Sequence, residues 1–180
     1  MINKIQRIIF VILISLIFCC DNLFAFGVPL SFKEMVRKSD LILIGEVKEV
    51  RENSWVYVNH THRIRGSTAE IEVRNVIKGS LGKGEGNNIF VRYLGTSEFW
   101  VEDQPEFRNS ERVLLFLKKI KGNYYGSVNL YAGKVEISDK NTVWIGDEDS
   151  KVKLNENLTI DECIERIKRY MSLEGKNEKK

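Results

Sequence analysis

The sequence predicts a single α+β domain dominated by antiparallel β-sheet. Short apolar or alternating segments, separated by turn residues, recur between residues 41 and 145 and predict about six strands. A helix-start signature precedes this region at residues 31–34, and a second one follows it at residues 159–162. The chain of 180 residues has the length of one domain. The expected order is therefore helix, strands, helix.

Both helix signatures are capping boxes, Ser31–Glu34 and Thr159–Glu162. The N-cap hydroxyl accepts from a backbone N–H of the first turn, and the Glu carboxylate accepts from the N-cap N–H. We expect a short helix over 32–38 and an amphipathic helix over 159–171. Cys163 falls on the apolar face of the second helix. A buried, inert thiol is expected there; the alternative is a nucleophile with a histidine as its base.

Two apolar runs, Leu41–Ile44 and Val113–Leu117, predict strands that are covered on both faces. Gly45 directly follows the first run, which predicts a bend or a close approach of another backbone. The strand expected over 64–77 alternates until its phase slips at Asn75-Val76, which predicts a β-bulge. The remaining strands are expected from residues 89, 124, 135 and 142 onward, with a hairpin turn at 121–123.

The first 25 residues have the pattern of a secretory signal. Lys4 and Arg7 precede an apolar run over 8–18, and we expect cleavage after Ala25. A mature chain of 155 residues would keep one of the three Cys, so no disulfide framework is expected. We expect one domain over 26–173 and a disordered, charged tail over 174–180.

The predicted location is outside the cytoplasm, either periplasmic or extracellular. A lipoprotein is the alternative, because Cys19 and Cys20 lie at the end of the apolar run. Lipidation at either Cys would tether the protein to a membrane of the envelope. Nucleic acid is not expected as a partner, since a net charge of +3 offers little attraction for phosphates.

Three segments carry a resemblance to a known type of protein: Ser39–Val47, Ala69–Gly79 and Asn109–Leu117. They resemble barrel strands of secreted OB-fold modules of the tissue-inhibitor-of-metalloproteinases and netrin type. In that pattern a short helix leads into Ser-Asp-apolar-Gly-x-Val, and a later strand closes with Lys-Gly. This chain looks closest to an exported bacterial branch of the type. The resemblance covers roughly residues 31–137 and implies an OB-fold-like closed barrel with a short N-terminal helix and a C-terminal covering helix.

The resemblance departs from the animal inhibitors at the mature N-terminus. Those proteins place there a disulfide-bonded Cys that ligates the protease zinc, whereas Phe26 is the expected first residue here. No residue therefore inherits the inhibitory role. A secreted protease inhibitor that inserts the segment 26–29 into an active site stays as an alternative function.

Candidate metal ligands are His60 and His62, the only histidines. On a strand, residues two apart point to the same face, where two imidazoles could hold Zn²⁺ or Cu²⁺. The alternative is an exposed, polar hairpin end. The glycine-rich stretch over 79–86 lacks the Lys-Ser/Thr of a P-loop and precedes a strand rather than a helix, so we expect a loop and no cofactor.

The candidate contact residues are Phe99 and Trp100, an aromatic pair beside a polar loop. They belong to a larger set that could form an aromatic platform on the barrel or contribute to its core: Trp55, Tyr57, Phe90, Tyr93, Phe99 and Trp100. The leading hypothesis is an exported, non-enzymatic module that binds a protein or envelope component through loops at one barrel mouth. The alternatives are the protease inhibitor and a metal binder or metal-dependent enzyme built on His60 and His62.

The export prediction has a direct test in the intact mass of the mature protein isolated from its source. We expect a mass that matches residues 26–180, because Ala25 is the small residue before the expected cleavage site. A mass that begins at Cys19 or Cys20 and includes acyl chains would contradict the soluble form and establish a lipid anchor.

Overall fold

The computed structural model of the protein describes residues 30–57, 63–82, 86–98, 101, 104–145 and 156–177. The predicted signal over 1–25, its alternative lipidation sites Cys19 and Cys20, and the end of the predicted tail lie outside these residues. Four of the candidate site residues do so too: His60, His62, Phe99 and Trp100.

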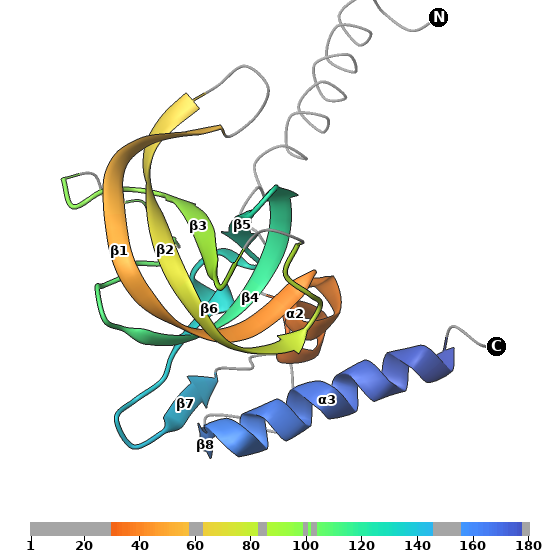
Figure 1. Ribbon diagram of the computed structural model, residues 1–180. Helices are drawn as coiled ribbons and strands as arrows, with labels where there is room; N and C mark the ends of the chain where they lie inside the picture. The colour runs from red at the N-terminus through yellow and green to blue at the C-terminus, as the bar shows by residue number, and fades with distance from the viewer. Residues whose placement is uncertain are drawn as a thin grey trace, which may run out of the picture.

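Five strands form a closed barrel, in the order β1-β2-β3-β5-β4 with β4 paired back to β1 (Figure 1). The β3–β5 pair is parallel and the other pairs are antiparallel. This arrangement confirms the predicted OB-fold-like α+β class. The strands are β1 (Leu41–Tyr57), β2 (Arg63–Lys78), β3 (Asn88–Leu94), β4 (Arg112–Lys121) and β5 (Tyr124–Ser127).

Two helices and a small sheet complete the described part of the chain. Helix α2 spans Phe32–Lys38, and α3 spans Ile160–Asn177. A 3-10 turn, η1 (Leu130–Gly133), leads into β6 (Lys134–Glu136), which pairs with β4. Strands β7 (Thr142–Ile145) and β8 (Glu156–Thr159) form a separate antiparallel pair.

One helix boundary and one strand differ from the prediction. Helix α3 continues to Asn177 rather than ending before Gly175, so the first residues of the predicted tail are helical. A glycine in a helix costs only about 1 kcal/mol relative to alanine and does not oblige the helix to stop. Strand β8 was not predicted, because its short segment carries little alternation and is defined by its pairing with β7.

Both predicted capping boxes are present. In α2 the Glu34 N–H donates to Ser31 Oγ at 3.3 Å, and the Ser31 N–H donates to Glu34 Oε2 at 3.2 Å. In α3 the Glu162 N–H donates to Thr159 Oγ1 at 3.3 Å, and the Thr159 N–H donates to Glu162 Oε2 at 2.9 Å. These hydrogen bonds from the Thr159 backbone and side chain lower the pKa of Glu162. The hydrogen bonds from Ser31 likewise lower the pKa of Glu34.

The apolar core divides into two clusters on the two sides of the barrel wall. Side chains that point into the barrel form one cluster: Leu41, Leu43, Val47, Ala69, Ile71, Ile89, Val91, Tyr93, Phe107, Val113, Leu115, Leu117 and Tyr125. The intervening side chains of β1 and β4, such as Ile42, Leu114 and Phe116, belong to a second cluster with α2 and α3. The predicted burial of both faces of these strands is thereby confirmed.

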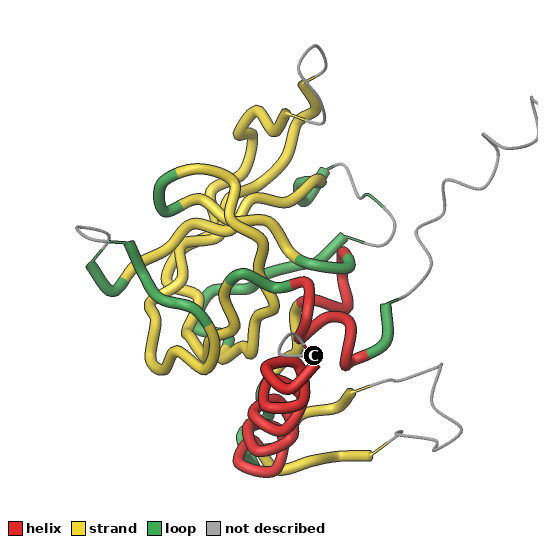
Figure 2. Tube along the Cα trace, turned by 90° about the vertical axis from the view of Figure 1, so that its right-hand side faces the viewer, coloured by secondary structure: helices red, strands yellow, loops and turns green. Residues whose placement is uncertain are grey.

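The helices lie together at one end of the barrel, with α3 beneath the strands in Figure 1 and beside α2 in Figure 2. Phe32 of α2 contacts Phe116 of β4 and Tyr170 of α3 edge to face, at ring-centroid distances of 5.5 and 6.1 Å. The C-terminal helix α3 therefore packs on the outside of the barrel wall through α2.

Gly45 and the bulge behave as predicted. A Cβ at Gly45 would lie 2.5 Å from Ile71 Cγ2 and 2.9 Å from the Glu72 carbonyl oxygen, so β2 approaches β1 here too closely for a side chain. The β1–β2 register shifts between Ile42 and Leu43 and again between Ile44 and Gly45. These shifts flank the pairing of Asn75 and Val76, where the sequence phase slips.

A polar junction ties α2 to the barrel. The Asp40 carboxylate accepts from Lys118 Nζ at 2.7 Å and from the Lys119 N–H at 3.0 Å. These two hydrogen bonds, first from Lys118 and then from Lys119, lower the pKa of Asp40. Lys78 Nζ donates to the carbonyl oxygens of Val36 and Arg37 at 2.7 and 3.0 Å, at the C-terminal end of α2.

Gly79 follows Lys78 and completes this junction. Its φ is +80°, and a Cβ there would lie 2.3 Å from the Asp40 carbonyl oxygen. Gly122, in the β4–β5 turn, also has a positive φ, +56°, but a Cβ there meets nothing within 4 Å. The two glycines share the backbone conformation and differ in the space around them.

This difference predicts the effects of two alanine substitutions. Gly122→Ala should cost about 1 kcal/mol of unfolding free energy, because only the left-handed backbone penalises a Cβ. Gly79→Ala should cost at least about 3 kcal/mol, since the Asp40 backbone must also move away. Urea unfolding followed by circular dichroism measures both. Equal losses for the two variants would contradict the close approach at Gly79.

Candidate binding site at the barrel mouth

Residues 95–111 join β3 to β4, and the described part of this segment, 95–98, 101 and 104–111, lies on the side of the barrel away from α2 (Figures 1 and 2). The end of this segment is held against β1 beyond the point where β4 stops pairing. Val47 N–H donates to the Glu111 carbonyl at 2.9 Å, and Ser110 N–H donates to the Val47 carbonyl at 2.8 Å. Asn109 Oδ1 accepts from the Val50 N–H at 3.1 Å. The segment is thus attached to the wall rather than hanging free.

Ser110 has a φ of +64°, in the left-handed region that favours glycine. In this conformation the Ser110 N–H reaches the Val47 carbonyl oxygen.

A pocket of about 190 Å³ opens between this segment and the ends of β1, β2 and β3. We call it the mouth pocket. Its lining mixes aliphatic, aromatic, hydroxyl, amide and carboxylate groups: Val50, Glu52, Ser67, Tyr93, Leu94, Gly95, Thr96, Ser97, Val101, Gln104, Pro105, Glu106 and Phe107. Such convergence of polar groups on a partly apolar hollow is typical of binding sites.

The floor of the mouth pocket is aromatic. Tyr93 and Phe107 are 8% and 4% exposed, and their ring centroids lie 5.1 Å apart. Both belong to the interior cluster, so the pocket rests on the barrel core. Burial raises the pKa of the Tyr93 phenol above its usual range, although a hydrogen bond with Ser67 works against this shift. The Tyr93 phenol therefore stays protonated at neutral pH.

Hydrogen bonds between segments fix the rim. Ser67 Oγ donates to the Gly95 carbonyl at 2.7 Å, and the Leu94 N–H donates to Gln104 Oε1 at 3.3 Å. Ser97 Oγ donates to Glu52 Oε2 at 2.7 Å. These bonds join β1, β2 and β3 to both halves of the segment.

A buried ion pair supports the pocket wall from outside. Lys134 Nζ and Glu111 Oε1 are 2.5 Å apart, with side chains 12% and 7% exposed. Lys134 also donates to the Glu106 carbonyl and lies 5.1 Å from the centroid of the Phe107 ring. A second Glu111 oxygen accepts from the Arg108 N–H at 3.1 Å. The pair therefore links β6 to residues 106–111.

The candidate contact residues Phe99 and Trp100 fall in the same segment but outside the described residues, as do His60 and His62. Ser97 and Val101, which flank this pair in the sequence, line the mouth pocket. The prediction for Phe99 and Trp100 themselves stays a prediction. A single aromatic platform is not formed by the described members of that set. Phe90 stacks on Tyr124 at 5.3 Å, whereas Tyr93, three residues along the same strand, points into the barrel.

Cys163 is fully buried in the helix-facing cluster, as expected. Burial raises the pKa of its thiol to about 12, so it carries almost no thiolate at neutral pH. Within the described residues, no three His, Cys, Asp or Glu side chains converge as a metal site.

Most residues that line the mouth pocket were not predicted from the sequence, and Tyr93 was predicted only as a member of a possible aromatic platform or of the core. Ser67, Tyr93 and Phe107 belong to three separate segments, and a local pattern does not reveal that they converge. One available signal was strand alternation: residues 90 and 93 of one strand point to opposite faces, so Tyr93 and Phe90 cannot belong to the same face of the barrel. The polar composition of residues 95–111 was visible but indicated only a loop.

No protein-family model matches the sequence, and no curated protein matches it either. Among the described helices, none has the length and apolar character needed to cross a membrane. The site is therefore interpreted from its own geometry.

The buried ion pair yields a stability prediction. Lys134→Met should cost about 3 kcal/mol of unfolding free energy, because it leaves the Glu111 carboxylate buried without its cation. The double variant Lys134→Met/Glu111→Gln should recover most of that loss. Arg108→Met, which removes the exposed pair with Glu106, is the control and should cost less than about 1 kcal/mol. Chemical unfolding measures all three, and a double variant as unstable as Lys134→Met would contradict the interpretation.

Proposed function

We propose that this protein is an exported, non-enzymatic binding module that contacts an extracytoplasmic protein or envelope component through its barrel mouth. One observation carries the proposal: a pocket with an aromatic floor and a polar rim lies between β1, β2, β3 and the segment that follows β3, on the side of the barrel away from α2. Binding residues on loops positioned by a rigid scaffold are a common arrangement. Export itself is inferred from the signal pattern in residues 1–25.

The volume of the mouth pocket favours contact with part of a larger partner. At about 190 Å³ it is smaller than the roughly 300–1,000 Å³ of sites that enclose whole cofactors or drug-sized ligands. A single side chain of a partner fits such a hollow, with the surrounding loop making the rest of the interface. The alternatives, a protease inhibitor acting through 26–29 and a metal site at His60 and His62, involve residues outside those described.

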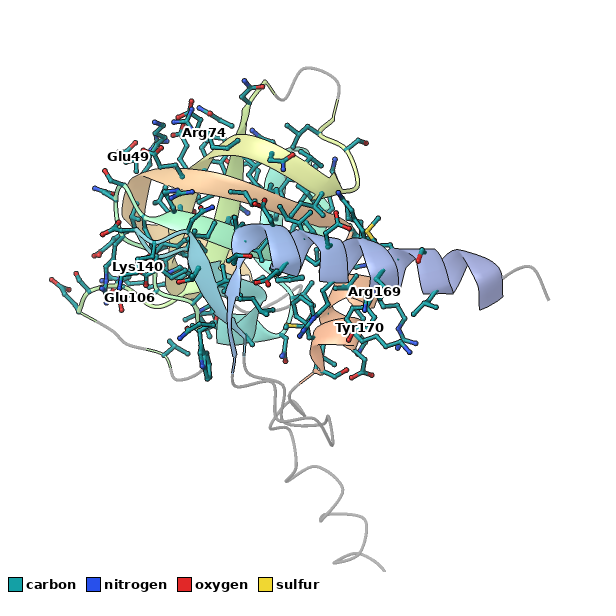
Figure 3. The ribbon with its side chains drawn as sticks, turned by 90° about the horizontal axis from the view of Figure 1, so that it is seen from below. Glu49, Arg74, Glu106, Lys140, Arg169 and Tyr170 are labelled. Atoms are coloured by element: carbon teal, nitrogen blue, oxygen red, sulfur yellow. The ribbon has the colours of Figure 1, made fainter. Side chains whose placement is uncertain are left out.

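Site-specific photocrosslinking tests this proposal in the source cell. A photoreactive phenylalanine analogue at Val101, which lines the pocket, should give a discrete covalent adduct with one partner. The same analogue at the exposed Arg169 on α3 is the control and should give none; Figure 3 shows Arg169 at the opposite side of the molecule from Glu106 of the pocket rim.

The adduct is then tested with purified components. The partner identified by mass spectrometry should bind the wild-type protein, and Val101→Trp, which fills the pocket, should weaken that binding at least about tenfold. An unchanged melting temperature of the variant would show that the fold is intact. Adducts from Arg169 alone, or no adduct from Val101, would contradict binding at the mouth.

A further inference from the structure

The mouth pocket is acidic in a protein whose net charge is positive. Of its lining residues, all of which the structure describes, Glu52 and Glu106 carry charge and none is basic. Glu111, at the end of the segment between β3 and β4, is paired with Lys134 and does not line the pocket. Glu52 and Glu106 therefore give the lining a charge opposite in sign to the net charge of +3 of the chain.

The two carboxylates approach the pocket from different segments and retain capacity to accept hydrogen bonds. Glu52 Oε2 accepts from Ser97 Oγ at 2.7 Å. Glu106 makes a 3.5 Å contact with Arg108 in which both side chains are 73% exposed, so water screens this pair strongly. Burial is the main cause of the raised pKa of the Tyr93 phenol, and the charges of Glu52 and Glu106 act in the same direction.

The apolar part of the lining complements a long, flexible stem. Val50, Leu94, Val101 and Pro105 surround the pocket above the Tyr93–Phe107 floor. Lysine and arginine bury their methylene stems against apolar surface while the charged head stays at a polar rim. The aromatic rings at the base extend the apolar surface that the stem contacts. The volume of the pocket matches one such side chain rather than a larger molecule.

We propose, building on the binding function above, that the mouth pocket receives a lysine or arginine side chain presented by a protein partner. The Glu52 and Glu106 carboxylates accept charge-assisted hydrogen bonds from its ammonium or guanidinium group. The aliphatic and aromatic walls hold its stem. The negative charge of the lining attracts a basic partner surface before contact is made.

Amide-resolved NMR titration of the purified protein tests this ligand class without knowledge of the partner. The probes are N-acetyl-arginine amide, N-acetyl-lysine amide and the neutral N-acetyl-norleucine amide. Probes of this size are expected to bind with a Kd of about 1 mM, so titration to about 20 mM reaches saturation. The cationic probes should shift the resonances of Gly95, Ser97 and Gln104, and should bind about tenfold more tightly than norleucine.

Charge variants give the matched control. Glu52→Gln should weaken the cationic probes about threefold, and Glu52→Gln/Glu106→Gln about tenfold, with norleucine binding unchanged. Glu49→Gln removes the same charge from the same strand outside the pocket, where Glu49 pairs with Arg51 at 2.7 Å. It should leave probe binding unchanged; Figure 3 shows Glu49 near Arg74 and apart from Glu106.

Three outcomes would overturn the inference. These are equal affinity for the cationic and neutral probes, no saturable shift at the pocket with any probe, and saturation by calcium chloride with no response to the amines. The last would instead identify a divalent-cation site. None of them affects the crosslinking test at Val101, which does not depend on the charge of the partner. If Val101 gives no adduct but the cationic probes bind, the proposed function is rejected, while the preference of the pocket for cationic side chains is retained.

Discussion

The burial of both faces of β4 is the constraint on which the rest of the fold depends. All five residues from Val113 to Leu117 are buried, alternately against the barrel interior and against the helices. A strand of this kind needs a cover on its outer face. If Leu114 and Phe116 were exposed there, each would lose about 2 kcal/mol of hydrophobic stabilisation. Helices α2 and α3 supply that cover, joined to Phe116 through Phe32 and Tyr170. Barrel and helices therefore stabilise each other.

The residues behind the family resemblance act in this architecture rather than at the candidate site. Asp40 holds the β4 backbone, Lys78 binds the last carbonyls of α2, and Gly79 admits the close approach of Asp40. Ser110 occupies the left-handed position that glycine usually fills. In this chain these residues close the barrel and attach it to α2. A fold of this class hosts many functions, so such contacts carry information on architecture and not on activity.

The two sides of the barrel are chemically different. On the side of the helices, α2 and α3 pack with the outer side chains of β1 and β4 in an apolar cluster. On the side away from α2, the Tyr93–Phe107 floor of the mouth pocket lies beneath a rim of hydroxyl, amide and carboxylate groups. The buried Lys134–Glu111 pair keeps the rim segment in place, since separating its charges inside the protein is costly. A pocket made rigid in this way loses little entropy on binding, which favours recognition of a single side chain.

The sequence by itself determined the elements whose signals are local. Two capping boxes, the apolar runs at Leu41 and Val113 and the phase slip at Asn75-Val76 each act within a few residues, through backbone hydrogen bonds and strand alternation. The tertiary structure alone decided the pairing of β7 with β8, the extension of α3 past Gly175 and the mouth pocket. Glu52, Ser67 and Tyr93 come together through the pairing of β1 with β2 and of β2 with β3, and the segment between β3 and β4 brings Glu106 to them. The residues of the mouth pocket come from segments far apart in the chain, and local propensities do not determine which distant segments meet.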